Sequence, residues 1–376
     1  MGRWRSILTV HEMQPRRPAI AFVCGREAEY PRNLSAVDAL QLLGDVQVIA
    51  PRKGRLSLNL LRIALRALTA RSVPDFTFIG FYGQPLVFPV RLRWRRPLVL
   101  DAFVSTWDTY CFDRRIFAPD SLPGRLLFQL DHAACARADR VIVDTHAHAE
   151  FFHRTFGVPR DKLRVVYVGC DDEHFRPRPI DPLSDVSRRI LFYGTFLPLH
   201  GVDVILDAAH LLREEGVTFR IVGAGQQSAA VRRQAAELGL DNLEFVDSVP
   251  YAALPDEIAA AAICLGGHFG RSEKAARVIG AKSFQCMSVG RPTILGDNAA
   301  NRELFTHGEH AWMVRMGDPA ALADGIRALL ADADLRRRLS VAGSARAREC
   351  GGVAAVRAAF REAVAGLHRR ECSQSN

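Results

Sequence analysis

Lys282 is the side chain with the most specific chemical meaning in this sequence. The chain of 376 residues holds only four lysines against 46 arginines, and Lys282 stands at the start of a predicted helix near residues 280–289. A lysine ammonium is a compact point charge suited to a phosphate, and the amide groups of a helix N-terminus add to anion binding. The position therefore predicts a phosphate contact. A surface lysine near a helix start is the alternative.

Glycines that directly follow apolar, strand-like runs are the second feature that indicates a ligand-binding site. Gly194, Gly223 and Gly225 occupy such positions in the second half of the chain, and Gly25 does so in the first half. Ligands of open α/β sheets bind outside the carboxyl ends of the strands, where glycine lets a ligand approach the backbone. Gly223 and Gly225 also begin a dinucleotide-like pattern in which Ser228 replaces the third glycine, so a nicotinamide-dependent enzyme stays open as an alternative.

Short apolar strands alternate with helices around these residues. Strands are predicted over 19–24, 46–49, 76–79, 98–100, 141–143 and 163–166, and again over 190–193, 219–222, 243–246, 263–265 and 292–295. Helices are predicted over 34–43, 123–138, 146–156, 201–215, 227–239, 319–331 and 334–368. This alternation is typical of doubly wound parallel sheets in an α/β protein.

Three prolines within six positions, Pro177, Pro179 and Pro182, predict a linker between two such units. The resulting domain organisation has an N-terminal Rossmann-like domain over 1–176 and a second Rossmann-like domain over 177–350. The remaining residues, 351–376, are predicted to be a C-terminal helix.

Composition and cysteine usage exclude several classes of protein. Hydrophobic residues make up 48% and charged residues 24%, which is ordinary for a globular chain and excludes disordered, collagen-like and coiled-coil proteins. The eight cysteines include no CxxC pair and suggest no disulfide framework, so we expect a cytoplasmic location. No apolar run reaches the ~20 residues of a membrane-spanning helix, and the first residues do not resemble a signal peptide.

The net charge of +9 is concentrated in the first half of the chain. Residues 52–96 hold ten basic residues and one acidic residue, which predicts an anionic partner; a solvated basic face is the alternative. On a helical wheel one apolar stripe is expected to pack on the sheet, with arginines opposite. The stripe is Leu60, Leu61, Ala64, Leu65 and Leu68, and the arginines are Arg55, Arg62 and Arg66. We expect peripheral binding to the inner face of an anionic membrane through residues 52–96, and no nucleic-acid partner.

The second half resembles the family 4 (group 1) glycosyltransferases of the GT-B fold. The resemblance rests on segments that occur in the family's order and spacing over more than 150 residues. They are 191–194, 200–203, 223–225, 241–245, 282–294, 302–305 and 317–322. It implies two Rossmann-like domains that face a cleft, with the C-terminal helix crossing back to the first domain. It also implies sugar transfer from a nucleotide-sugar to a glycan, lipid-linked or small-molecule acceptor. The reaction would retain anomeric configuration, with no metal and no cofactor.

The resemblance also implies roles for individual residues. The implied catalytic residues are Asp101 and Lys282, and the implied acceptor contacts are Gly25, Trp107 and Asp108. The implied donor contacts are Gly194, Thr195, His200, Gly223, Gly225, Arg277, Lys282, Gln285 and Glu303. Asp101 would orient or deprotonate a hydroxyl, and a helix or turn cap is the alternative for it. Asp113 and Arg114 follow in the same loop and are interpreted as exposed charges; residues that line the acceptor groove are the alternative.

Four positions depart from the usual family pattern. Thr195 and His200 stand where the family usually has arginine and lysine, and Arg277 and Gln285 replace two glutamates eight residues apart. His200 is a cation only near or below its ordinary pKa of ~6.5. Arg277 would hold a phosphate or a sugar carboxylate, and Gln285 a ribose hydroxyl. The Lys-x-x-Gln arrangement looks like a variant subgroup. A GT-B module that binds nucleotide-sugar or glycan without turnover remains the alternative.

Overall fold

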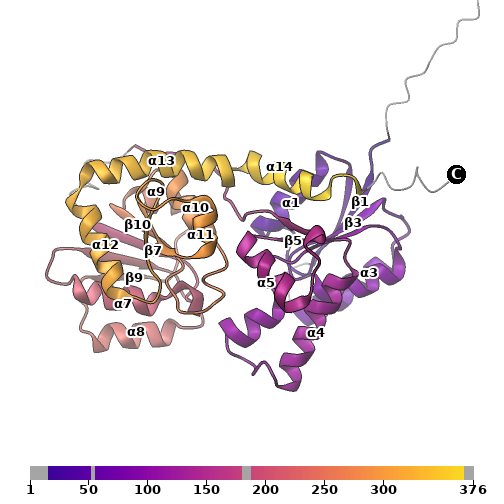
Figure 1. Ribbon diagram of the computed structural model, residues 1–376, viewed down its shortest axis with the longest axis horizontal. Coiled ribbons are helices and arrows are strands. Elements are labelled where there is room, and N and C mark those ends of the chain that lie inside the picture. The colour runs from indigo at the N-terminus through magenta and orange to yellow at the C-terminus, as the bar shows by residue number, and fades with distance from the viewer. Residues whose placement is uncertain (1–15, 52–55, 180–187, 368–376) are drawn as a thin grey trace, which may run out of the picture.

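The structure is a computed structural model that describes residues 16–51, 56–179 and 188–367. It contains two six-stranded parallel sheets, one in each half of the chain, with helices packed on both faces of each (Figure 1). The predicted α/β class with two doubly wound sheets is confirmed. Within the described ranges, every helix is too short or too polar to span a lipid bilayer.

The first sheet has the strand order β2-β1-β3-β4-β5-β6. Its strands are β1 (Ala19–Val23), β2 (Asp45–Ile49), β3 (Phe76–Ile79), β4 (Leu98–Asp101), β5 (Arg140–Val143) and β6 (Leu163–Val165). One face is covered by α2 (Leu56–Thr69), α3 (Val87–Arg93), α4 (Leu122–Arg137) and α5 (His146–Phe156). The other face is covered by α1 (Pro31–Gln41) and by a helix from the far end of the chain.

The second sheet has the strand order β12-β11-β10-β7-β8-β9. Its strands are β7 (Arg189–Tyr193), β8 (Thr218–Val222), β9 (Leu243–Val246), β10 (Ile263–Gly267), β11 (Thr293–Asp297) and β12 (Trp312–Arg315). One face packs against α7 (Val202–Leu211), α8 (Ser228–Glu237) and α12 (Pro319–Ala331). The other packs against α9 (Leu254–Ala259), α10 (Ala281–Ser288) and α11 (Ala299–Leu304).

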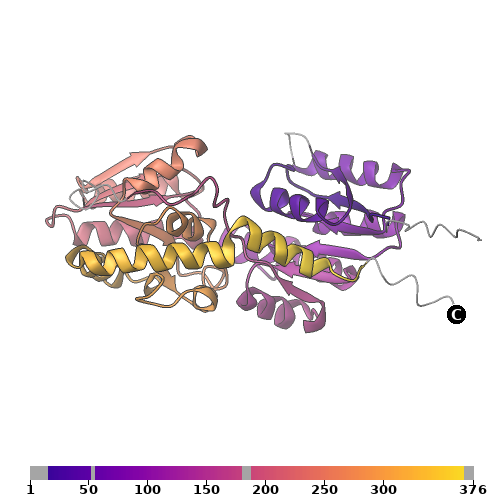
Figure 2. The same cartoon turned by 90° about the horizontal axis from the view of Figure 1, so that it is seen from above.

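Two consecutive helices carry the chain from the second sheet back to the first. Helix α13 (Ala333–Gly351) runs along the second domain, and α14 (Val353–Val364) continues onto the first (Figure 2). The buried side chains of Val356, Phe360 and Val364 pack with strands β1 and β3. The predicted return of the C-terminal helix is therefore present. The chain breaks into two helices at Gly351 and Gly352, close to the predicted start of the C-terminal helix at residue 351.

Other expectations about elements were wrong. The strand β12 was not predicted, and the predicted apolar stripe of α2 was only partly right. Leu60 and Ala64 pack against the core, but Leu61 and Leu65 do not. Ile63 and Ala67 face the sheet, whereas Leu61 and Leu65 are 59% and 53% exposed, as is Leu58 at 51%. Arg55 and Pro182 lie outside the described residues. The seven described cysteines are free thiols, as expected.

Candidate functional site

The segments that follow the strands of the two sheets meet between the domains. Asp108, after β4, pairs with Arg277, after β10, with 2.8 Å between Oδ1 and Nη2. The Thr145 hydroxyl, after β5, donates to the Arg277 carbonyl, and the Gln226 amide, after β8, donates to the Arg114 carbonyl at 3.2 Å. The strand order of the second sheet reverses between β7 and β10, where open α/β sheets bind ligands. The loops after these two strands form the candidate site.

Lys282 lies in the first turn of α10 and is only 7% exposed. Its Nζ is 4.9 Å from the centre of the Phe192 ring, and a Cβ atom added to Gly194 would lie 3.3 Å from Nζ. This nitrogen has no hydrogen-bond partner among the described residues. The amine therefore lies beside the glycine that ends β7, at the reversal point, with its donors unused. Its placement fits the predicted phosphate contact.

Burial controls the charge of the three basic groups around this point. It lowers the pKa of Lys282 to about 7. The pKa of His200 falls well below its usual value, first because of burial and then because of Lys282 and His268. His268 stacks on His200 with ring centres 5.6 Å apart, and burial and Lys282 lower its pKa to about 3. Both imidazoles are neutral at pH 7, and protonation of His200 needs a pH well below its ordinary pKa of 6.5.

Thr195 and His200 interact with each other. The Thr195 residue is exposed, and its carbonyl oxygen accepts a hydrogen bond from Nδ1 of the buried His200. The bond fixes the ring at the end of the loop after β7. These two residues therefore supply no positive charge where the family usually has an arginine and a lysine.

Close backbone packing explains the glycines after β8. A Cβ atom on Gly223 would lie 2.0 Å from the Gly194 carbonyl oxygen, and one on Gly225 would lie 2.6 Å from the Phe196 nitrogen. Gly223 also has a φ of 133°, which disfavours other residues. The loops after β7 and β8 can approach each other only because these residues are glycines. Backbone packing therefore explains the spacing of Gly223 and Gly225 without a bound dinucleotide.

Gln285 and Glu303 are held by tyrosines. Tyr193 donates its hydroxyl to Gln285 Oε1 at 2.8 Å, which orients the amide on α10. Tyr167 donates to Glu303 Oε2 at 3.0 Å. Glu303 also accepts the backbone N–H groups of residues 146 and 147, at 2.8 and 2.7 Å, at the N-terminus of α5. The geometry of Glu303 therefore favours a role in joining the domains over the predicted donor contact.

Asp101 lies in a buried ion pair. Its Oδ2 and Oδ1 accept hydrogen bonds from Nε and Nη2 of Arg32, both at 2.9 Å, and both side chains are 1% exposed. Arg32 also donates to the Val166 carbonyl at 2.8 Å. Both carboxylate oxygens are occupied, so the geometry favours a structural role over the predicted general base. Asp101 is not a helix or turn cap either.

Two predicted acceptor contacts pack within the first domain. A Cβ atom on Gly25 would lie 2.1 Å from the Tyr82 carbonyl oxygen, so this glycine serves backbone packing. Trp107 packs edge-on against Phe112, Phe128 and Phe156, with ring centres 4.8–6.0 Å apart. The acceptor contacts of Gly25 and Trp107 stay predictions. Asp108, the third predicted contact, does lie between the domains.

Sequence reasoning missed two charged residues of this region. Asp113 was interpreted as an exposed charge, yet it is 1% exposed. Lys274 was not singled out, yet it is buried and donates to the Thr109 hydroxyl of the first domain at 2.6 Å. The rarity of lysine, which drew attention to Lys282, was a signal for Lys274 too. No group of three or more His, Cys, Asp or Glu side chains in the described part of the chain is arranged to hold a metal ion.

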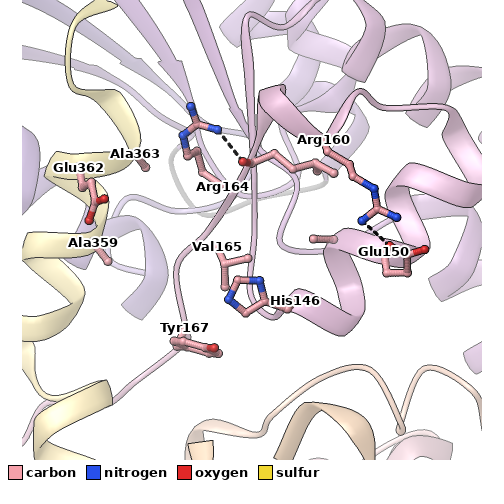
Figure 3. Close-up of a pocket in the computed structure, with 11 residues that line it drawn as sticks. His146, Glu150, Arg160, Arg164, Val165, Tyr167, Ala359, Glu362 and Ala363 are labelled. Carbon is pink, nitrogen blue, oxygen red and sulfur yellow. Dashed lines mark hydrogen bonds and ion pairs between the residues drawn. The ribbon is translucent and has the colours of Figure 1, made fainter. Parts of the chain in front are cut away.

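A cavity of about 610 Å³ lies away from this site, beside the edge strand β6 (Figure 3). Its wall is formed by α5, β6 and α14, with His146, Arg164 and Glu362 among the lining residues. Arg160, at its rim, pairs with Glu150 at 2.6 Å. Its lining carries charges of both signs, and Arg160 is already paired with Glu150, so it is a weaker ligand site than the candidate site at Lys282.

Solved structures share this architecture. Anabaena Alr3699/HepE, in complex with UDP and glucose, superposes with a TM-score of 0.70 at 17% identity, covering 92% of this chain and 99% of that one. Sucrose-phosphate synthase from Thermosynechococcus elongatus gives 0.71 at 18% identity, covering 92% and 98%. The fold and the facing strand ends therefore define a GT-B protein.

The family follows from two sequence models, one for each half. "Glycosyl transferase 4-like domain" matches residues 8–169, and "Glycosyl transferases group 1" matches residues 187–332. The chain belongs to the group 1, family 4 glycosyltransferases. It is 27% identical to D-inositol 3-phosphate glycosyltransferase of Nocardia farcinica over 67% of this chain. It is 30% identical to phosphatidyl-myo-inositol mannosyltransferase of Mycobacterium leprae over 42%. The chain spans 57% and 41% of the length of these relatives.

Proposed function

We propose that this protein transfers a sugar from a nucleotide-sugar to an acceptor hydroxyl. The observation that carries the proposal is the unpartnered Lys282 amine at the reversal point of the second sheet. Negative charge develops on the leaving diphosphate as the sugar bond breaks, and a preorganised cation with a helix N-terminus stabilises it. We further propose that the reaction retains anomeric configuration and needs neither metal nor cofactor, because Lys282 supplies the positive charge.

A panel of UDP-, GDP-, ADP- and TDP-sugars tests the donor site by thermal shift. A ligand present at 100 times its Kd adds ~2.7 kcal/mol to the free energy of unfolding, which is a readily measured rise in Tm. Slow release of nucleoside diphosphate from the stabilising donor, unchanged by EDTA, supports the enzyme. Stabilisation without any release over days points to the alternative, a binding module without turnover. No shift with any donor rejects the proposal.

Donor affinity should depend on pH through Lys282. Its pKa of about 7 makes the amine neutral above that pH in the free protein. Since only the ammonium binds diphosphate strongly, the Kd should rise by up to tenfold per pH unit above pH 7–8. Titration calorimetry between pH 6.5 and 9 measures this, and Lys282→Met should give a much flatter profile. A flat wild-type profile contradicts the assignment.

The same group has the opposite effect on the stability of the free protein. Between pH 7 and the ordinary lysine pKa of 10.5, the unfolded chain binds a proton that the folded chain lacks. The contribution of Lys282 to the free energy of unfolding therefore rises with pH across this window. Ligand-free unfolding curves distinguish this effect from donor binding.

We propose that the acceptor is a glycan, a lipid-linked sugar or polyol, or a small molecule, reached from an anionic membrane surface. Exposed leucines on α2 support the proposed contact with a membrane surface. These are Leu58, Leu61 and Leu65, and they lie beside Arg62 and Arg66. Apolar side chains next to basic ones are typical of helices that lie in the membrane interface. The net charge of +9 adds attraction, at ~1 kcal/mol for each basic residue near anionic lipid.

Replacing Leu61 and Leu65 together by serine should weaken vesicle binding by about tenfold to a hundredfold. Burying a leucine contributes roughly 1.5–3 kcal/mol, and about half of each side chain is still available to a membrane. Co-sedimentation with vesicles of phosphatidylcholine and phosphatidylglycerol at low salt measures the change. Val341→Ser, at an exposed valine of α13, is the matched control. Equal sedimentation of the wild type with neutral and anionic vesicles contradicts the idea.

A further inference from the structure

Four charged residues from both domains meet next to the proposed donor site; three are buried and Arg277 is partly buried. Asp108 and Asp113 come from the segment after β4, and Lys274 and Arg277 come from the loop after β10. We call these four residues the interdomain cluster. The backbone of Leu199, in the loop that follows β7, opposes the rise in the pKa of Asp113 that burial causes. The cluster therefore touches both loops that flank Lys282.

The positive charge of Arg277 is already neutralised. Its Nη2 lies 2.8 Å from Asp108 Oδ1, and its Nη1 lies 3.1 Å from Glu273 Oε2. The guanidinium also lies 4.0 Å from the centre of the Phe151 ring. Contacts on these sides fix the group and balance its charge. Arg277 is therefore a poor site for a sugar carboxylate, the role that its sequence position suggested.

The charges of Lys274 and Asp113 are also balanced by neighbouring groups of opposite charge. Burial lowers the pKa of Lys274, and the carboxylates of Asp108, Asp113 and Asp144 oppose that change. Burial raises the pKa of Asp113, and Lys274 opposes it. The cluster as a whole holds two cations and two carboxylates, so an anion entering it meets repulsion as well as attraction.

The cluster also holds buried polar atoms of both kinds without partners. Asp108 Oδ2 and Asp113 Oδ1 are acceptors, and Arg277 Nε is a donor; none has a hydrogen-bond partner among the described residues. Buried polar atoms in folded proteins are nearly always hydrogen-bonded. A carboxylate or phosphate only accepts, so it cannot satisfy the two aspartate oxygens. A hydroxyl donates and accepts, so it can satisfy every atom of this set.

We propose that the interdomain cluster binds the hydroxyls of a neutral transferred sugar and selects it over a sugar acid. The inference rests on the proposed function and names the substrate class of the same site. The two aspartates accept from sugar hydroxyls, and the arginine and lysine hold those carboxylates in place. A uronic acid would bring a third carboxylate to a site that already contains two.

Donors that differ at one carbon test the inference. We would measure Kd by titration calorimetry for UDP, UDP-glucose and UDP-glucuronate, with GDP, GDP-mannose and GDP-mannuronate as the second set. The wild type should bind the neutral hexose at least tenfold more tightly than the corresponding uronate. Equal or tighter binding of the uronate overturns the inference. It does not contradict the proposed donor site. If neither UDP nor GDP binds, the proposal of a donor site is wrong, and the inference that rests on it is wrong too.

A variant separates sugar binding from a purely structural contact between the domains. Asp113→Asn should weaken the neutral nucleotide-sugar at least fivefold, change the diphosphate less than twofold, and reduce discrimination against the uronate. Asp120→Asn, at an exposed aspartate of the same loop, is the matched control. Equal weakening of the diphosphate and the sugar nucleotide overturns the sugar contact. If the Asp113→Asn protein does not fold, the comparison of hexose and uronate donors with the wild type still tests the inference, because it needs no variant.

Discussion

Replacing Lys282 by alanine should weaken donor binding by about tenfold to a hundredfold and leave the fold intact. The structure places its amine beside Gly194, without a hydrogen-bond partner in the part of the chain that it describes. Hydrogen bonds between charged groups contribute ~1.5–3 kcal/mol, which corresponds to that range of affinity. The effect should be large because the neighbouring basic groups do not substitute for it. His200 is neutral, and Arg277 is paired with Asp108.

Titration calorimetry with the best donor of the panel measures the loss. Lys282→Arg should restore only part of the affinity, because a planar guanidinium is bulkier than an ammonium. Lys162→Ala is the matched control, since that lysine lies in the first domain and donates to the Ala138 carbonyl at 3.0 Å. Unchanged affinity and turnover in Lys282→Ala would reject the proposed donor site.

The fold was largely predictable because its signals are local. Each buried strand of the first sheet appears in the sequence as a short apolar run. The segments between these runs are long enough for the helices that connect the strands. The strand β12 was missed because Trp312 and Arg315 bound a short segment at the sheet edge, where burial is incomplete. The boundary between α13 and α14 matches the predicted start of the C-terminal helix at residue 351, although two glycines at residues 351 and 352 end α13 without a proline to mark the point.

The face of α2 could not be predicted from its leucines. The helix has apolar residues on more than one side, and Ile63 and Ala67 fit against the sheet at nearly zero exposure. Leu61 and Leu65 consequently face outward. Periodicity shows that a helix is amphipathic, but a wide apolar sector does not show which part of it meets the core.

The candidate site was only half predictable, and long-range pairing explains the difference. Lys282 and the glycines stand at strand ends and helix starts, which the sequence marks directly. Asp101 also stands at a strand end, yet its partner Arg32 is 69 residues away. Asp108 and Arg277 are separated by 169 residues and by the domain boundary. Which charges neutralise each other depends on the packing of the domains, so a strand-end position alone does not identify a catalytic group.

Replacing Asp101 by alanine should destabilise the protein by about 3–5 kcal/mol with little change in donor affinity. Removing one partner of a buried ion pair leaves the other charge uncompensated. Arg32 would remain 1% exposed, between the rings of Phe103 and Phe360 at 4.8 and 5.2 Å. At 2–4 °C per kcal/mol for a domain of this size, the expected fall in Tm is roughly 6–20 °C.

The double variant Asp101→Ala with Arg32→Met tells a structural role from a catalytic one. Removing both charges takes away the uncompensated cation, so the double variant should recover much of the stability lost by Asp101→Ala alone. Donor release and transfer, measured well below the lowered Tm, should stay within a few-fold of the wild type in both proteins. The opposite pattern, with wild-type Tm and lost turnover in Asp101→Ala, would show that the carboxylate acts on substrate. In that case the ion pair with Arg32 would have to open during the reaction.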